Sequence, residues 1–309
     1  MARRKQQKYP PWAAAIVLLV CLIVGVASAL NKPAQPKQTA AQSVSGSDET
    51  LVYFLDVGQG DCELIRLKSG ENILIDSGTG ETEKKLVTYL KDLKVEKIDY
   101  LIATHPHADH IGGMAQIAEN FEIGKIYMPK IADNQVPTTA TYADLLKAID
   151  RKGLKVTQAK GGMTILDSGG EKLEIFAPNS AKYSELNSYS VVTKLTSGEK
   201  SFLFTGDAQA DSEKEMIAKG YDLKSDVLKC GHHGSSTSTS AAFLKAVSPS
   251  AAVISCGVDN DYGHPDSQVV ARLQKAGVTI YRTDLLDTIV AACDGKSIRF
   301  TTNQKSVIK

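Results

Sequence analysis

The 309-residue sequence has no excess of charge of either sign, and it contains few aromatic residues. There are 36 lysines and arginines against 35 aspartates and glutamates, and aromatic residues make up 6% of the chain. This balance excludes a globally polybasic nucleic-acid binder and an acidic disordered chain. Apolar residues make up 42%, which is enough for a sizeable core in one large domain or two ordinary ones.

Cysteine is also scarce, and its spacing excludes one kind of metal site. None of the five cysteines forms a CxxC pair, which is the usual spacing of a cysteine zinc site. Cys21 lies in an apolar segment, and the other four lie in or next to predicted strands: Cys62, Cys230, Cys256 and Cys293. The sequence leaves open whether these four form disulfides or are buried free thiols.

There is a single long uncharged apolar run, and it follows a basic N-terminus. Residues 1–12 contain four basic residues and no acidic one, and residues 13–30 carry no charge. The pattern predicts a signal peptide or a single membrane anchor over residues 1–30, with the downstream chain outside the cytoplasm. Ala27-Ser28-Ala29 resembles a signal-peptidase site, and without cleavage the segment would remain as an anchor.

Residues 31–50 contain few large apolar side chains, so they predict a flexible linker rather than part of a core. Residues 1–30 hold four of the basic residues and none of the acidic ones, which leaves the rest of the chain with a formal charge of −3. The part predicted to be exported is therefore mildly acidic. Any DNA-binding surface on it must be local.

The predicted folded region, residues 51–309, alternates apolar runs with helical patterns. The predicted strands cover residues 51–57, 62–67, 72–76, 100–104, 125–129, 173–178, 190–195, 201–206, 226–230, 251–257, 278–284, 288–294 and 297–302. The predicted helices cover residues 81–93, 141–152 and 209–219, and a fourth starts with Asp266 as N-cap and ends at Gly277. The alternation predicts an α/β layered domain with two sheets.

The chain has only six histidines, and all of them fall in three short segments. They are His105, His107 and His110 in HPHADH, the adjacent His232 and His233, and His264 before a proline. Imidazole and carboxylate groups bind zinc and other first-row metals. His105 and His107 can face one ion, and Asp109 and His110 a second. A polar loop without metal is the alternative, and the clustering argues against it.

These motifs resemble those of the metallo-β-lactamase-fold hydrolases, whose signature HxHxDH matches HPHADH. The segments FLDVGQGDCELI (54–65), HHGSS (232–236) and GHP (263–265) resemble, more narrowly, the extracytoplasmic hydrolase domain of ComEC-type DNA-uptake proteins and their free-standing relatives. The resemblance covers residues 51–302. It implies a four-layer αββα sandwich that binds two divalent metal ions, zinc or manganese.

The resemblance also implies roles for single residues. The implied metal ligands are His105, His107, Asp109, His110, Asp207 and His233, with Asp207 bridging the two ions. Asp76 is expected to orient the metal loop, and Asp61 either supports that loop or serves only its own turn. Asn187 stands where most binuclear members have a further histidine. We therefore expect weaker binding at the His105/His107 site, which also makes manganese a candidate.

The expected catalytic residues are Asp109, His232 and His264. Asp109 would bind metal and orient the nucleophile, His232 would contact substrate or transfer a proton, and His264 would contact phosphate or protonate the leaving group. A structural role for His264 is the alternative. The substrate-binding candidates are Gly234, Ser235 and Ser236, whose backbone and hydroxyl groups can donate to an oxyanion, unless this loop is merely solvated.

The leading hypothesis is an exported phosphodiesterase or nuclease of ComEC type that uses a metal-activated hydroxide. Its partners would be a phosphodiester substrate, with DNA implied by the resemblance, and the membrane if the N-terminal segment is uncleaved; no protein partner is indicated. A hydrolase of lactams, lactones or thioesters is the second hypothesis. The absence of a histidine at position 187, where Asn187 stands, argues against it. A non-catalytic tethered binding module is the third, and the intact HxHxDH motif and Asp207 argue against that.

Overall fold

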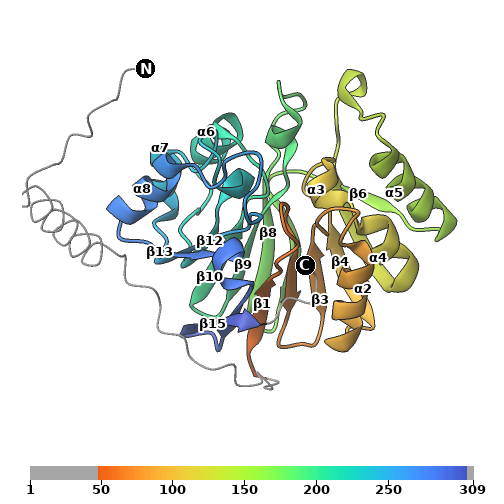
Figure 1. The fold of residues 1–309 in the computed structure, drawn as a ribbon, viewed down its shortest axis with the longest axis horizontal. Coiled ribbons are helices and arrows are strands. Elements are labelled where there is room, and N and C mark those ends of the chain that lie inside the picture. The colour runs from red at the N-terminus through yellow and green to blue at the C-terminus, as the bar shows by residue number, and fades with distance from the viewer. Residues whose placement is uncertain (1–47, 305–309) are drawn as a thin grey trace, which may run out of the picture. The chain divides into compact units, whose positions relative to one another are not determined.

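The computed structural model describes residues 48–304, which form two β-sheets with helices on their outer faces (Figure 1). The predicted signal or anchor segment, residues 1–30, lies outside the described residues, as does the predicted linker up to residue 47. Among the described residues, no helix combines the length and the apolar character needed to span a bilayer.

The first sheet has eight strands in the order β15-β14-β1-β2-β3-β4-β5-β6. They are β1 (Thr50–Phe54), β2 (Glu63–Arg66), β3 (Asn72–Ile75), β4 (Lys97–Ile102), β5 (Glu122–Pro129), β6 (Val156–Ala159), β14 (Thr288–Cys293) and β15 (Ile298–Gln304). Strands β3 to β6 are parallel to one another. Strand β1 runs in the same direction, because it is antiparallel to β2 and β2 is antiparallel to β3.

The second sheet has seven strands in the order β13-β12-β11-β10-β9-β8-β7. They are β7 (Met163–Ser168), β8 (Glu171–Ala177), β9 (Val192–Ser197), β10 (Lys200–Phe204), β11 (Val227–Lys229), β12 (Ala251–Ile254) and β13 (Thr279–Arg282). Strands β10 to β13 are parallel, and β7 to β10 pair antiparallel. Each sheet therefore has a parallel part, whose carboxyl ends share one edge.

Helices cover the outer face of each sheet (Figure 1). Those packed on the first sheet are α2 (Glu83–Asp92), α3 (Ala108–Ile111), α4 (Met114–Asn120) and α5 (Ala140–Arg151). Those packed on the second are α6 (Ala210–Ala218), α7 (Ala241–Val247) and α8 (Ser267–Lys275). The short elements are α9 (Thr283–Leu286) and the 3-10 turns η1 (Asp133–Gln135), η2 (Leu186–Tyr189) and η3 (Gly231–Gly234).

Alternating side chains of β1 show how the layers stack. Leu51 and Tyr53 pack with the helices on the first sheet, whereas Val52 and Phe54 pack between the two sheets. The rings of Phe54 and Phe204, one from each sheet, lie 6.0 Å apart in that central core. A strand that is buried on both faces needs a layer on each side. The order helix, sheet, sheet, helix thus matches the predicted αββα layering.

Every predicted strand and helix of the described region is present. Asp266 caps α8 by accepting a 2.7 Å hydrogen bond from the backbone N–H of Gln268, and Gly277 follows the helix with a φ of 73°. Strands β6 and β7 were not predicted, and they form one edge of each sheet. The four cysteines of the described region are buried free thiols, which resolves the alternative that the sequence left open.

Candidate metal centre

The predicted site residues lie in the loops and short helical turns that follow parallel strands of both sheets. Asp76 follows β3, His105 follows β4, Asp207 follows β10, and the His232–His233 pair follows β11. Carboxyl ends of parallel strands meet at one edge, which is where ligands bind in many α/β folds. The two sheets place these edges together, so side chains far apart in the sequence converge there.

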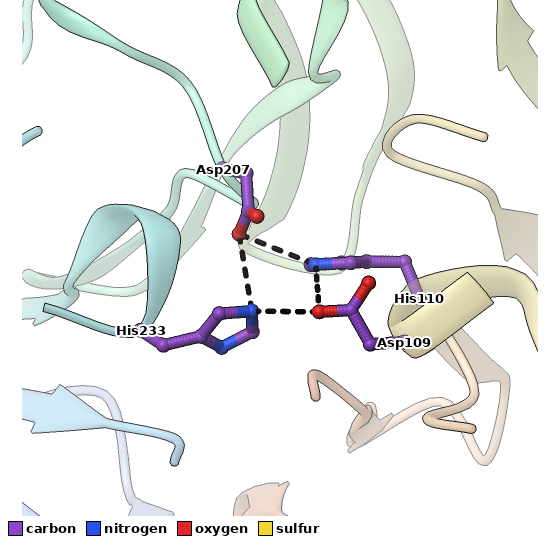
Figure 2. A group of neighbouring side chains, drawn as sticks. All are labelled: Asp109, His110, Asp207 and His233. Carbon is purple, nitrogen blue, oxygen red and sulfur yellow. Dashed lines mark hydrogen bonds and ion pairs between the residues drawn. The ribbon is translucent and has the colours of Figure 1, made fainter. Parts of the chain in front are cut away.

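Four of these side chains form a compact donor group, shown in Figure 2: Asp109, His110, Asp207 and His233. Asp207 Oδ1 lies 3.2 Å from His110 Nε2 and 3.6 Å from His233 Nε2. Asp109 Oδ2 lies 3.2 Å from His233 Nε2 and 3.9 Å from His110 Nε2. The four donor atoms all lie within 4.8 Å of one another, so a single cation can contact them together.

Hydrogen bonds on the far side of each imidazole direct the Nε2 atoms into this group. His110 Nδ1 lies 2.7 Å from Asp76 Oδ2, and His233 Nδ1 lies 3.0 Å from the carbonyl oxygen of Ser255. Both partners accept, so each ring carries a proton on Nδ1, which leaves Nε2 as the atom that would bind a metal ion. His110 Nε2 and Asp207 Oδ1 are buried without a hydrogen-bond partner among the described residues. These residues therefore fit a divalent metal ion.

The second oxygen of Asp207 faces a different set of side chains. Asp207 Oδ2 lies 3.8 Å from His105 Nε2 and 3.7 Å from His232 Nε2. His105 Nε2 in turn lies 3.0 Å from His107 Nδ1, and Asn187 Nδ2 lies 3.3 Å from His232 Nε2. The two oxygens of one carboxylate thus point to two groups of potential ligands, which is the arrangement that a bridging aspartate needs.

The backbone at the histidine pair is unusual. His232 and His233 both have left-handed conformations, with φ of 50° and 54°. Left-handed non-glycine residues cost of order 1–3 kcal/mol each and persist where the surrounding structure enforces them. Here the conformation sends two adjacent imidazoles to opposite oxygens of Asp207. His233 therefore joins the four-residue group, whereas His232 lies beside Asn187.

Charges within the centre stabilise one another. Burial favours the neutral carboxyl of Asp109, but the hydrogen bond with His233 and the charge of His110 hold its pKa well below the usual range. Burial likewise opposes charge on Asp207, and His110 and His233 lower its pKa. Burial opposes charge on His233 as well, yet Asp207 and Asp61 raise its pKa to about 10. A metal ion would take over the stabilising role of these protons.

A buried ion pair lies beneath the centre. Lys229 Nζ donates a 2.7 Å hydrogen bond to Asp61 Oδ2, and Asp61 Oδ1 lies 3.2 Å from His233 Nδ1. Burial opposes charge on Lys229, but Asp61 and Glu63 raise its pKa above the usual range. Asp61 thus contacts His233. The sequence had left open whether Asp61 supports the metal site or only stabilises its own turn. The sequence analysis did not predict that Lys229 lies next to the centre. A lysine at the end of the apolar strand β11 was the available signal.

The two groups open into a cleft of about 390 Å³. Its lining residues are Gln59, His107, Ala108, Asp109, Asn187, Asp207, His232, His233, Tyr262 and His264. The ring centroid of His264 lies 5.4 Å from that of His232 and 6.1 Å from that of His233, so His264 lies at the cleft beside the histidine pair. Tyr262 was not predicted; its place one residue before the GHP segment was the available signal.

The predicted oxyanion donors do not line this cleft. They are Gly234, Ser235 and Ser236. The Ser235 hydroxyl lies 3.1 Å from that of Thr237, and Ser236 is exposed. Gly234 has a φ of 81°, and a Cβ there would lie 2.7 Å from Pro265 Cβ. This glycine therefore permits the close approach of the segment that carries His264.

Residues 55–258 match the metallo-beta-lactamase superfamily, and the chain belongs to that superfamily. It is similar to ComE operon protein 3 of Bacillus subtilis (strain 168), with 29% identity over 260 residues, which is 79% of this chain and 33% of that protein. It is also similar to competence protein ComA of Neisseria gonorrhoeae, with 32% identity over 240 residues, which is 77% of this chain and 31% of that protein. The chain thus spans about a third of the length of these curated relatives.

Solved structures share the fold at low sequence identity. CmlA, a diiron beta-hydroxylase from Streptomyces venezuelae, matches with a TM-score of 0.51 and 18% identity over 76% of this chain and 52% of that chain. This likeness concerns the fold alone.

Proposed function

We propose that the protein is a metal-dependent hydrolase of phosphodiesters, and specifically a nuclease of ComEC type. The observation that carries the hydrolase proposal is Asp207, whose two oxygens each face a separate group of imidazoles at the floor of an open cleft. The resemblance of the sequence motifs to ComEC-type DNA-uptake proteins, together with the name of the curated relative competence protein ComA, supports a nucleic-acid substrate.

The proposed cofactors are two divalent ions, zinc or manganese. Asp109, His110 and His233 would hold one ion, His105 and His107 would hold the other, and Asp207 would contact both. When bound, the ions would activate a water molecule and neutralise phosphate oxygens. Asn187 is a neutral amide whose Oδ1 is buried without a partner among the described residues, so it suits a weakly held ion.

The chain's own residues orient this centre and contact the substrate. Asp76 and the Ser255 carbonyl fix the rings of His110 and His233, as described above. His264 is held at the rim because its backbone N–H donates to Asn260 Oδ1 at 3.0 Å, and Asn260 Nδ2 donates to the His264 carbonyl at 2.7 Å. We assign His232 to contact with the phosphate and His264 to protonation of the leaving group.

The test compares bis(p-nitrophenyl) phosphate and single-stranded DNA with a chromogenic cephalosporin, using protein loaded with Mn²⁺ or Zn²⁺. We expect turnover of the phosphodiesters, loss of turnover with a chelator, and recovery when the metal is returned. Asp109→Ala should lower kcat by at least about 100-fold. Asp144→Ala is the matched control, because Asp144 is an exposed carboxylate on α5. Preferential turnover of the cephalosporin, or full activity of metal-loaded Asp109→Ala, would contradict the proposal.

We also propose an extracytoplasmic location, with the chain anchored by one N-terminal helix or released by cleavage. The support is the basic tip and the uncharged residues 13–30. N-terminal sequencing of the protein from intact cells, together with its digestion by added protease, tests the orientation and the cleavage. Protection of the whole chain from protease would contradict it.

A further inference from the structure

An exposed tyrosine stands at the rim of the metal cleft and also lines a second cavity. The Tyr262 side chain is 71% exposed. It contributes to the wall of the cleft and to an adjoining cavity of about 380 Å³, which shares Gln59 and Tyr262 with the cleft. The remaining walls of this cavity are Gly58 and residues 257–261. Its volume lies in the range of small-molecule sites.

Tyr262 ends a series of nearly parallel rings that starts at the metal centre. The buried ring of His233 and the ring of His264 have centroids 6.1 Å apart and an interplanar angle of 30°. The rings of His264 and Tyr262 have centroids 5.7 Å apart and an angle of 19°. These separations are those of offset aromatic pairs. Because Tyr262 is largely exposed, its ring retains accessible area on which a further planar ring can stack.

The loop that carries Tyr262 is held in place by hydrogen bonds. Besides its two bonds with His264, Asn260 Nδ2 donates to the Gly257 carbonyl at 2.9 Å. The Gly257 N–H donates to Gln59 Oε1 at 3.0 Å, which ties the loop to the turn after β1. A ring that stacks on Tyr262 would therefore meet a surface that is already ordered, and the entropy cost of binding is small.

The charges around the second cavity disfavour a phosphate group there. No lysine or arginine lines this cavity or the cleft, as far as the structure describes the chain. Two carboxylates, Asp259 and Asp261, line the second cavity. Like charges would repel a phosphate group placed in this cavity, whereas an uncharged heterocycle carries no such penalty.

We propose that this second cavity is a subsite for the heterocyclic base attached to the phosphate in the metal cleft, with Tyr262 as its stacking platform. The inference rests on the proposed nuclease function and adds the residue that would recognise the nucleoside part of the substrate. Base–aromatic stacking tolerates any base, since every base has a planar face. Tyr262 is thus a specificity-determining residue that favours nucleotides over simple alkyl phosphodiesters.

The test uses three p-nitrophenyl phosphodiesters with one leaving group: the thymidine 5′-phosphate, ethyl phosphate and choline phosphate esters. KM and kcat are measured for the full chain, for Tyr262→Ala and for Tyr262→Phe, at saturating Mn²⁺. We expect Tyr262→Ala to raise KM for the thymidine ester about tenfold relative to the ethyl ester. Tyr262→Phe retains the ring and should restore the preference. Leu285→Ala, at an exposed residue of α9, controls for loss of a surface apolar group.

Other outcomes would overturn the subsite. An equal loss for all three esters would show that Tyr262 only positions His264, and a selective loss for the choline ester would show a cation site. If the wild-type protein hydrolyses none of the esters, the proposed function fails. Titration calorimetry then tests separately whether the subsite binds a base. Thymidine 5′-monophosphate should then bind more tightly than inorganic phosphate to wild-type protein, and Tyr262→Ala should abolish that difference. Equal affinities in wild-type protein would contradict the subsite.

Discussion

Asp76 connects the backbone of the histidine loop to one of its imidazoles. Its carboxylate accepts hydrogen bonds from the N–H and the hydroxyl of Thr104 at 2.8 and 2.5 Å, and it lies 2.7 Å from His110 Nδ1. Asp76 is buried and has a φ of 55°. The left-handed backbone of Asp76 thus costs free energy on folding. Its hydrogen bonds with Thr104 and His110 set which nitrogen of His110 carries the proton.

We expect Asp76→Asn to weaken metal binding by about 10- to 100-fold, as for other groups that orient a ligand. The asparagine amide would donate to His110 Nδ1, which moves the ring proton to Nε2 and blocks the ligand atom. Competition with a chromophoric Zn²⁺ chelator measures the affinity. The exposed Asp144→Asn serves as control, and an unchanged affinity in Asp76→Asn would contradict this role for Asp76.

The sequence predicted residues of the centre that belong to compact motifs, because a short loop after a strand keeps its side chains together. Lys229 and Tyr262 could not be predicted in this way. Lysine is rarely buried unless it is paired, and the partner of Lys229 is Asp61, which lies 168 positions away in the sequence. Tyr262 lies in a loop whose path depends on Asn260, and no sequence period marks such a residue.

At the scale of elements, the two strands that were not predicted, β6 and β7, bury few of their side chains. Every side chain of β3 is buried, whereas three of the four side chains of β6 are exposed and only one side chain of β7 is buried. Strands β6 and β7 lie at sheet edges, where backbone pairing with one neighbour replaces apolar packing. Without an apolar run they give no signal in the sequence.

Helix α8 offers a test of the capping that the sequence predicted. Asp266→Ala removes the acceptor for the Gln268 N–H, and we expect it to lower the free energy of unfolding by about 1 kcal/mol. For a domain of this size that corresponds to a fall in Tm of about 2–4 °C. Asp266→Ser keeps a capping oxygen and should recover most of the loss in thermal melts. A larger fall for Ser than for Ala would exclude the capping explanation.

At the scale of the whole molecule, the metal centre joins the two sheets. Asp109 and His110 lie on α3, which follows β4 of the first sheet, and Asp207 and His233 follow β10 and β11 of the second. A bound ion therefore stabilises the packing of the sheets as well as the loops, because the unfolded chain does not hold these ligands together.

Metal binding should accordingly raise the thermal stability of the chain. Free metal at 100 times Kd adds about 2.7 kcal/mol to the free energy of unfolding. The expected rise in Tm is about 5–10 °C over chelator-treated protein. Calorimetry with metal analysis of the same sample measures it, and Asp207→Ala should show a smaller rise. Equal melting temperatures in a sample with bound metal would contradict this coupling.

The direction of β1 has a consequence for access to the cleft. Strand β1 runs parallel to β3 and β4, whose carboxyl ends precede Asp76 and His105. Thr50, at the amino end of β1, therefore lies at the opposite end of these strands from the metal centre. The chain upstream of Thr50 thus joins the described domain at the end of the sheet that faces away from the candidate metal centre. A polynucleotide substrate, under the proposed function, can therefore approach the cleft without passing Thr50.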